Sequence, residues 1–158
     1  MSASDPSDEA DHRPRHRIGE VAELAGVSTR TLRYYQELGL LTPSGTTAGG
    51  ARRYSDADVA RLQRIRHLRD LVGFNLTEIG VVVTAEDRLA EIRREWWAGL
   101  SPARRRELLN EALAINADLQ RAVRTKMAGL EEFLAGLEER AATIDRRLAE
   151  DEGVGVAR

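Results

Sequence analysis

The feature that most constrains the fold is a repeat in the last third of the sequence, where apolar residues recur alternately four and three positions apart. This spacing is the heptad pattern that keeps an apolar stripe on one side of a long helix. The stripe consists of Leu130, Leu134, Leu137, Ala141, Ile144 and Leu148, and Val123 and Met127 continue it upstream. The repeat therefore predicts a mainly α protein with one long coiled-coil helix.

The long helix is expected to begin at Ser101 and Pro102, which are typical of an N-cap and a first helical residue. An earlier stripe comprises Leu108, Ala112, Ile115 and Leu119, and the step from Leu119 to Val123 is a stutter that locally unwinds a supercoil. A stripe this long would stay exposed without a partner, so we expect a homodimer. The expected dimerisation residues are Leu119, Val123, Met127, Leu130, Leu134, Leu137 and Ile144. The alternative is that residues 139–158 fold back on their own chain.

Charge is unevenly distributed along the chain. The 158 residues carry 24 Lys+Arg and 26 Asp+Glu, a formal net charge of −2. Residues 12–69, however, hold 11 arginines and five acidic residues, a net charge of +6, whereas residues 70–158 have a net charge of −4. A basic block this local favours a polyanionic partner.

Two short helical patterns lie inside the basic block. Residues 18–25 place apolar side chains at helical spacing and end at Gly26, and Ser28 can cap a second helix that Gly39 closes. The side chains of the second helix expected to face inward are Leu32, Tyr35 and Leu38. Two short helices joined by a glycine-containing turn predict a helix-turn-helix.

A glycine-rich stretch follows, and it predicts a β-hairpin whose second strand is Arg52–Tyr54. Ser55 can cap a third helix, and the sequence "GFNLTEIGVVV" predicts a further short one that starts at Asn75 or Thr77. The apolar stripe expected along the third helix is Val59, Leu62, Ile65, Leu68 and Leu71. Together these elements predict a winged helix-turn-helix domain.

The second helix and the hairpin carry side chains suited to DNA. A helix-turn-helix presents the first residues of its second helix to base edges in the major groove, and arginine can bind guanine or phosphate through two hydrogen bonds. Tyr34 and Tyr35 are adjacent and about 100° apart on a helix, so we expect Tyr35 in the core and the Tyr34 hydroxyl on a phosphate. Arg61, Arg64 and Arg66 of the third helix would extend the basic surface.

The segments "IGEVAELAGVSTRTLRYYQELGLLTP" and "RRYSDADVARLQRIRHLRDLVGFNLTEI", separated by a hairpin and followed by a long helix, resemble the MerR family of transcription regulators over residues 17–83. The resemblance implies a winged DNA-binding domain, an antiparallel coiled-coil homodimer, and a promoter with an overlong spacer that is bent and untwisted to activate RNA polymerase. Matching positions imply DNA contacts by Ser28, Thr29, Arg30, Arg33, Tyr34, Arg52, Arg53 and Tyr54, and we add Arg61.

Two positions depart from the family pattern. Gln36 replaces the usual acid after the tyrosine pair, which would remove a partner for a nearby arginine. Ala51 replaces the usual aromatic residue before the wing arginine, which puts one wing contact in doubt.

The expected organisation is a disordered polar tail over residues 1–16, the DNA-binding domain over 17–83, a short linker helix over 84–100, the dimerisation helix over 101–150 and a flexible tail over 151–158. The sequence "RPRHR" in the first tail is either a solvated segment or a basic arm that touches a polyanion. Trp96 and Trp97, in the linker helix, are the only tryptophans. They either line a pocket for a small organic effector or pack against the dimerisation helix and the other subunit.

Other classes of function have little support in the sequence. There are no cysteines, which excludes thiolate metal sites, and we expect no metal, no cofactor and no catalytic site. No apolar run is long enough to serve as a signal peptide or to span a membrane, so we expect a cytoplasmic protein. The function we expect is a dimeric, sequence-specific transcription regulator. The alternative is an architectural or coiled-coil interaction protein that binds DNA without responding to a ligand.

Overall fold

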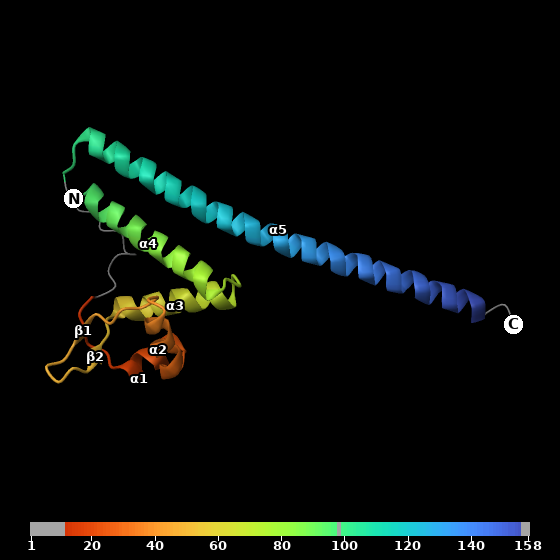
Figure 1. The fold of residues 1–158 in the computed structure, drawn as a ribbon, viewed down its shortest axis with the longest axis horizontal. Coiled ribbons are helices and arrows are strands. Elements are labelled where there is room, and N and C mark those ends of the chain that lie inside the picture. Colours follow the sequence, from red (N-terminus) through yellow and green to blue (C-terminus); the bar gives the residue numbers. More distant parts are fainter. Residues whose placement is uncertain (1–11, 98, 156–158) are drawn as a thin grey trace. The chain divides into compact units, whose positions relative to one another are not determined.

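The computed structural model describes residues 12–97 and 99–155, and Figure 1 shows the order of the elements. They are α1 (Ile18–Ala25), α2 (Thr29–Glu37), β1 (Gly45–Thr46), β2 (Arg52–Arg53), α3 (Asp56–Asp70), α4 (Leu76–Trp96) and α5 (Pro102–Gly155). The chain divides into two compact units, one running to Arg88 and the other beginning at Leu89. The predicted fold class, mainly α with a small β-hairpin and a long C-terminal helix, is confirmed.

Helices α1 and α2 form the predicted helix-turn-helix. Gly26 ends α1 in the left-handed conformation, at φ 65°, and its N–H donates to the carbonyls of Ala22 and Glu23. Two residues later the Ser28 hydroxyl accepts a hydrogen bond from the Thr31 N–H at 3.0 Å, which caps α2. Helix α1 packs against both α2 and α3, so the start of α2 is held at a fixed place on the unit.

The core of the first unit is built from apolar side chains of all four of its helices. Those buried there include Val21, Ala22, Leu32, Tyr35, Leu41, Leu62, Ile65, Phe74 and Ile79. Leu38 and Leu71 were expected in the core, but their side chains are 45% and 77% exposed. Both residues are C-caps. The helical spacing no longer predicts which side chains are buried once the helix has ended at these residues.

The wing is a two-stranded antiparallel hairpin in which Gly45 pairs with Arg53 and Thr46 with Arg52. The segment before α1 joins it, because His16 forms an antiparallel bridge with Tyr54. Its N–H donates to the Tyr54 carbonyl at 2.8 Å, and the Tyr54 N–H donates back at 3.0 Å. The predicted disorder of residues 1–16 is therefore wrong at residues 15 and 16, and residues 1–11 lie outside the described part of the chain.

A buried capping box fastens the wing to α3. The Ser55 hydroxyl accepts from the Asp58 N–H at 3.2 Å, and the Asp58 carboxylate accepts from the Ser55 N–H at 2.9 Å. The same carboxylate accepts from the Ser44 hydroxyl at 2.6 Å, next to β1. Ser55 is therefore the cap that the sequence predicted, and Asp58 adds a connection to the wing.

Helix α4 is longer than predicted, because the short helix ending near residue 83 and the linker helix over 84–100 form one helix, Leu76–Trp96. Asn75 is its cap, since its side-chain oxygen accepts from the Glu78 N–H at 2.9 Å. No glycine or proline lies between Val81 and Trp96, so nothing in the backbone chemistry ends the helix where the apolar pattern weakens. The first compact unit correspondingly extends to Arg88.

Helix α5 is a single unbroken helix of 54 residues, about 80 Å long at 1.5 Å per residue. The Ser101 hydroxyl accepts from the Arg104 N–H at 3.3 Å, as its predicted cap. The helix continues through Gly155, so the expected flexible tail from residue 151 is helical up to that point. Residues 139–155 do not fold back, because they belong to the same straight run of helix (Figure 1).

Replacing Asp58 with alanine is expected to destabilise the first unit by about 1–3 kcal/mol, because the buried Ser55 N–H and the Ser44 hydroxyl lose their shared acceptor. Urea denaturation followed by circular dichroism measures the change. Glu23→Ala is the control, since Glu23 is an exposed acid on α1 of the same unit. A loss for Asp58→Ala no larger than for the control would contradict the role of the box.

Candidate nucleic-acid interface

The arginines of α3 are held inside the first unit by partners on other elements. Arg61 donates through Nε to the Leu40 carbonyl at 2.6 Å and through Nη1 to both carboxylate oxygens of Asp87, at 2.6 and 2.8 Å. Arg64 Nε donates to Glu86 at 3.0 Å. These contacts fasten α3 to α4 and to the turn after α2.

The pairing has an electrostatic consequence for α3. The hydrogen bond that Arg64 donates to the Glu86 carboxylate raises the pKa of Arg64 above its ordinary value, outweighing the opposing effect of burial. Arg66 donates to the Ala25 carbonyl at 3.0 Å, at the end of α1. The guanidinium groups of Arg61, Arg64 and Arg66 thus bind carbonyls and carboxylates of the same unit. Their contribution to a DNA-binding surface stays a prediction.

The arginines of α2 and β2 are arranged differently. Arg30 and Arg33 are exposed on α2, and Arg53 is half-buried on the wing. Within the described residues, none of these three guanidinium groups has a hydrogen bond or an ion pair. Their charges are therefore available to an external anion.

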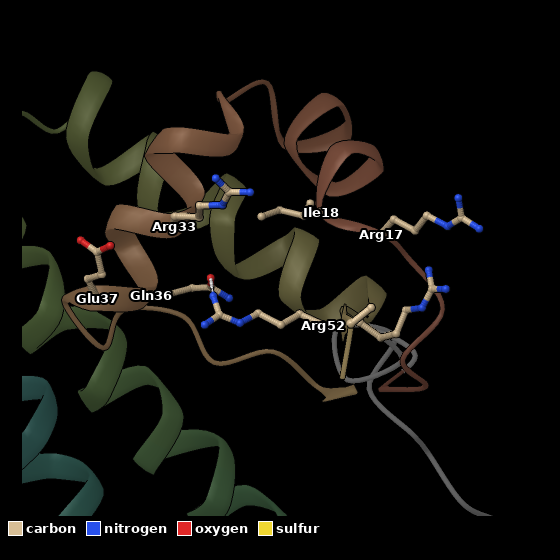
Figure 2. Close-up of a pocket in the computed structure, with 8 residues that line it drawn as sticks. Arg17, Ile18, Arg33, Gln36, Glu37 and Arg52 are labelled. Atoms are coloured by element: carbon tan, nitrogen blue, oxygen red, sulfur yellow. Dashed lines mark hydrogen bonds between the residues drawn. The ribbon is translucent and has the colours of Figure 1, made fainter. Parts of the chain in front are cut away.

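Two of the unpaired arginines, Arg33 and Arg53, line an open groove between the start of α1, the face of α2 and the wing. Its lining includes Arg17, Arg33, Arg52, Arg53 and a single acid, Glu37. Figure 2 shows Arg33 on α2, Arg52 reaching from the wing towards that helix, and Arg17 at the start of α1. Arg17 was not among the predicted site residues, because it comes to the wing only through the bridge that the neighbouring His16 forms with Tyr54.

Gln36 joins the wing to α2. Its side-chain oxygen accepts from Arg52 Nη1 at 2.7 Å (Figure 2). Its amide nitrogen donates to the Tyr54 hydroxyl at 2.9 Å. The interpretation that Gln36 deprives a nearby arginine of a partner is wrong, because an amide oxygen accepts as a carboxylate would. What the amide lacks is the negative charge.

The three tyrosines have different positions. Tyr34 is 48% exposed, whereas Tyr35 is buried and its hydroxyl accepts from Arg69 Nη1 at 2.7 Å, as the helical geometry predicted for the pair. Tyr54 was expected to contact DNA, but its side chain is completely buried. Its hydroxyl serves Gln36, so Tyr54 supports the wing and cannot reach a phosphate.

The start of α2 adds a favourable site for anions. Ser28 and Thr29 are exposed at its first turn, where N–H groups without helical partners and the helix dipole favour negative charge. The hydroxyl of Ser28 is already used as the cap. Thr29 and Arg30 therefore remain the exposed side chains closest to the helix start.

The tryptophans lie in the second unit. The Arg105 guanidinium carbon stands 5.6 Å from the centroid of the Trp96 ring, a cation–π contact between α4 and α5. Trp97 is 75% exposed. The packing of Trp96 against the long helix agrees with the structural alternative for that residue, whereas no residue packs over most of Trp97 within the described chain.

No group of three or more His, Cys, Asp or Glu side chains among the described residues could hold a metal ion. No helix in the same part of the chain is long and apolar enough to cross a membrane.

Comparison with known proteins agrees with this arrangement. Residues 16–86 match the family model described as MerR HTH family regulatory protein. The HTH-type transcriptional activator TipA of Streptomyces coelicolor is 46% identical over 82 residues, which cover 51% of this chain and 32% of TipA. The chain thus spans about a third of the length of that relative.

Two further relatives are matched over more of their length. The HTH-type transcriptional regulator YfmP of Bacillus subtilis is 32% identical over 95 residues, 60% of this chain and 68% of YfmP. The solved N-terminal part of Mta, the Bacillus subtilis multidrug transporter activator, has a TM-score of 0.55 at 30% identity and covers 85% of this chain and 98% of that one. The chain belongs to the MerR family, whose members are DNA-binding transcription regulators and not enzymes.

Proposed function

We propose that this regulator binds a palindromic promoter operator as a homodimer and distorts the spacer DNA to control transcription by RNA polymerase in the cytoplasm. The observation that carries the proposal is the division of the arginines. Those of α3 are paired within the unit, whereas Arg30, Arg33 and Arg53 have no partner among the described residues. Unpaired arginines on a recognition helix and its wing suit a polyanion that the helix can enter.

Each side chain of the surface has a proposed role. Thr29, Arg30 and Arg33 lie on the early turns of α2 and would contact base edges in the major groove. The exposed Tyr34 hydroxyl and the Ser28 backbone would contact phosphates. Arg17, Arg52 and Arg53 would hold the flanking backbone from the groove and the wing. Bending the spacer costs a few kcal/mol, which such phosphate contacts can offset.

The dimer is proposed from the surface of α5. Its heptad stripe is exposed in the single chain, and this exposure persists over most of the helix. The exposed fractions are 40% for Val123, 53% for Met127, 59% for Leu130, 54% for Leu134, 43% for Leu137 and 58% for Ile144. A second α5 would cover the stripe, and Leu119, which is half-buried, would join it at the upstream end.

The second candidate function is an architectural protein that binds DNA without a ligand. A ligand-responsive regulator needs an effector site, and the exposed Trp97 is the residue we propose for contact with a small organic effector. A change of DNA affinity with ligand separates the two functions.

Footprinting on the DNA upstream of the protein's own gene tests the proposed function directly. A protected site with two-fold symmetry, lying between or across the promoter elements, is the expected result. Protection without symmetry or sequence preference would favour the architectural alternative. No protection anywhere, at protein concentrations that saturate random DNA, would contradict operator recognition.

Replacing Arg30 or Arg53 with alanine is expected to have different effects on DNA binding. Arg30→Ala should cost about 1–3 kcal/mol on the operator and relax the preference at particular bases. Arg53→Ala should weaken binding to operator and random DNA alike and lower the slope of log K against log salt by about 1. Fluorescence anisotropy with both DNAs at several salt concentrations measures both quantities.

Arg61→Ala is the control for these variants, since it removes the same charge from a guanidinium that is already paired with Asp87. It should lower the melting temperature and leave the salt slope nearly unchanged. Equal losses on operator and random DNA for Arg30→Ala would remove its role in reading bases.

Leu137→Glu is expected to convert the dimer into a monomer, because it places a charge in the centre of the stripe. Ala135→Glu adds the same charge two residues away at an exposed position outside the stripe and should leave the dimer intact. Sedimentation equilibrium measures both masses. A dimeric Leu137→Glu protein would show that another surface joins the subunits.

A further inference from the structure

The contact between Gln36 and Arg52 carries an inference about the strength and salt dependence of DNA binding, which rests on the proposed function. Gln36 lies in the last turn of α2 and is half-buried. It meets Arg52 and Tyr54 at once, at 2.7 and 2.9 Å. Two residues of the wing are therefore tied to the recognition helix by one side chain.

The partners define how the amide is oriented. Arginine has only donors, so Arg52 must meet the amide oxygen, and the amide nitrogen then faces the Tyr54 hydroxyl. Since Tyr54 is completely buried, one end of this connection is rigid. The guanidinium of Arg52, on an exposed two-stranded wing, is consequently held beside α2 rather than left free to rotate in solvent.

The amide holds Arg52 without neutralising it. The α3 arginines provide the contrast within the same unit, because Arg61 and Arg64 are held by the carboxylates of Asp87 and Glu86. Around the groove, Arg17, Arg33, Arg52 and Arg53 face one acid, Glu37. A carboxylate in place of Gln36 would be a second acid, directly on Arg52.

We propose that Gln36 is a positioning residue that fixes Arg52 in the groove while leaving its positive charge available to a DNA phosphate. The amide thus separates two properties that a carboxylate would combine, namely the placement of the arginine and the cancellation of its charge. Each subunit's groove therefore binds DNA with one more effective positive charge than it would with a carboxylate at this position.

The variant Gln36→Glu tests the inference, because it keeps the shape of the side chain. The carboxylate can still accept from Arg52, and the Tyr54 hydroxyl can turn to donate to it. The melting temperature should therefore change little. Binding to a random-sequence duplex at low salt should weaken about tenfold per subunit, and the salt slope should fall by about 1 per subunit.

Two control variants separate charge from positioning. Gln120→Glu makes the same change at a glutamine of α5 that also accepts from an arginine, Arg124 at 3.1 Å, and it should leave the salt slope unchanged. Gln36→Met removes both hydrogen bonds but adds no charge. It should lower the affinity and the melting temperature while keeping most of the salt slope, since Arg52 remains a cation.

The outcomes distinguish this inference from the proposed function. Wild-type protein that binds neither operator nor random duplex would overturn the proposed function. Wild-type protein that binds both, with a Gln36→Glu slope equal to that of wild type, would overturn only the role of Gln36. A slope that falls equally in Gln36→Met and Gln36→Glu would overturn the charge argument, because the effect would then come from lost positioning alone.

Discussion

The burial of Tyr54 is the constraint on which the DNA-facing half of the first unit depends. Its ring is completely covered, its backbone pairs with His16 on one side, and its hydroxyl meets Gln36 on the other. Arg53 precedes it in the wing and Ser55, the cap of α3, follows it. One buried residue thus connects the segment before α1, the wing, the recognition helix and the start of α3.

The same unit uses arginine in two ways, which differ in whether the guanidinium group has a partner within the unit. Arg61, Arg64 and Arg66 close the spaces between helices by binding carbonyls and carboxylates. Arg30, Arg33 and Arg53 have no such partners among the described residues. A count of positive charges could not distinguish the two groups, because the distinction depends on acids such as Asp87 that are distant in sequence.

Local features of the structure were predictable from the sequence, and contacts between distant elements were not. Gly26 ends a helix, and Ser28 and Ser55 each begin one, through hydrogen bonds that span only a few residues. The spacing of these residues in the sequence was therefore sufficient to predict the helix ends. The family resemblance pointed to α2 and the wing as the candidate site, and their DNA contacts remain a prediction. The burial of Tyr54, the pairing of Arg61 with Asp87 and the part played by Arg17 depend on tertiary contacts, which periodicity does not record. The sequence predicted two helices in place of α4, because the apolar pattern weakens partway along it. No glycine or proline interrupts the backbone there, so the helix continues.

The exposed stripe of α5 has a consequence for how such a regulator responds to its own abundance. If two copies must meet before an operator is occupied, the population of the active species depends on the square of the monomer concentration wherever the monomer predominates. Doubling synthesis would then raise occupancy up to fourfold, before any ligand or promoter effect. A row of apolar side chains far along the chain from the recognition helix would in this way set the steepness of the transcriptional response.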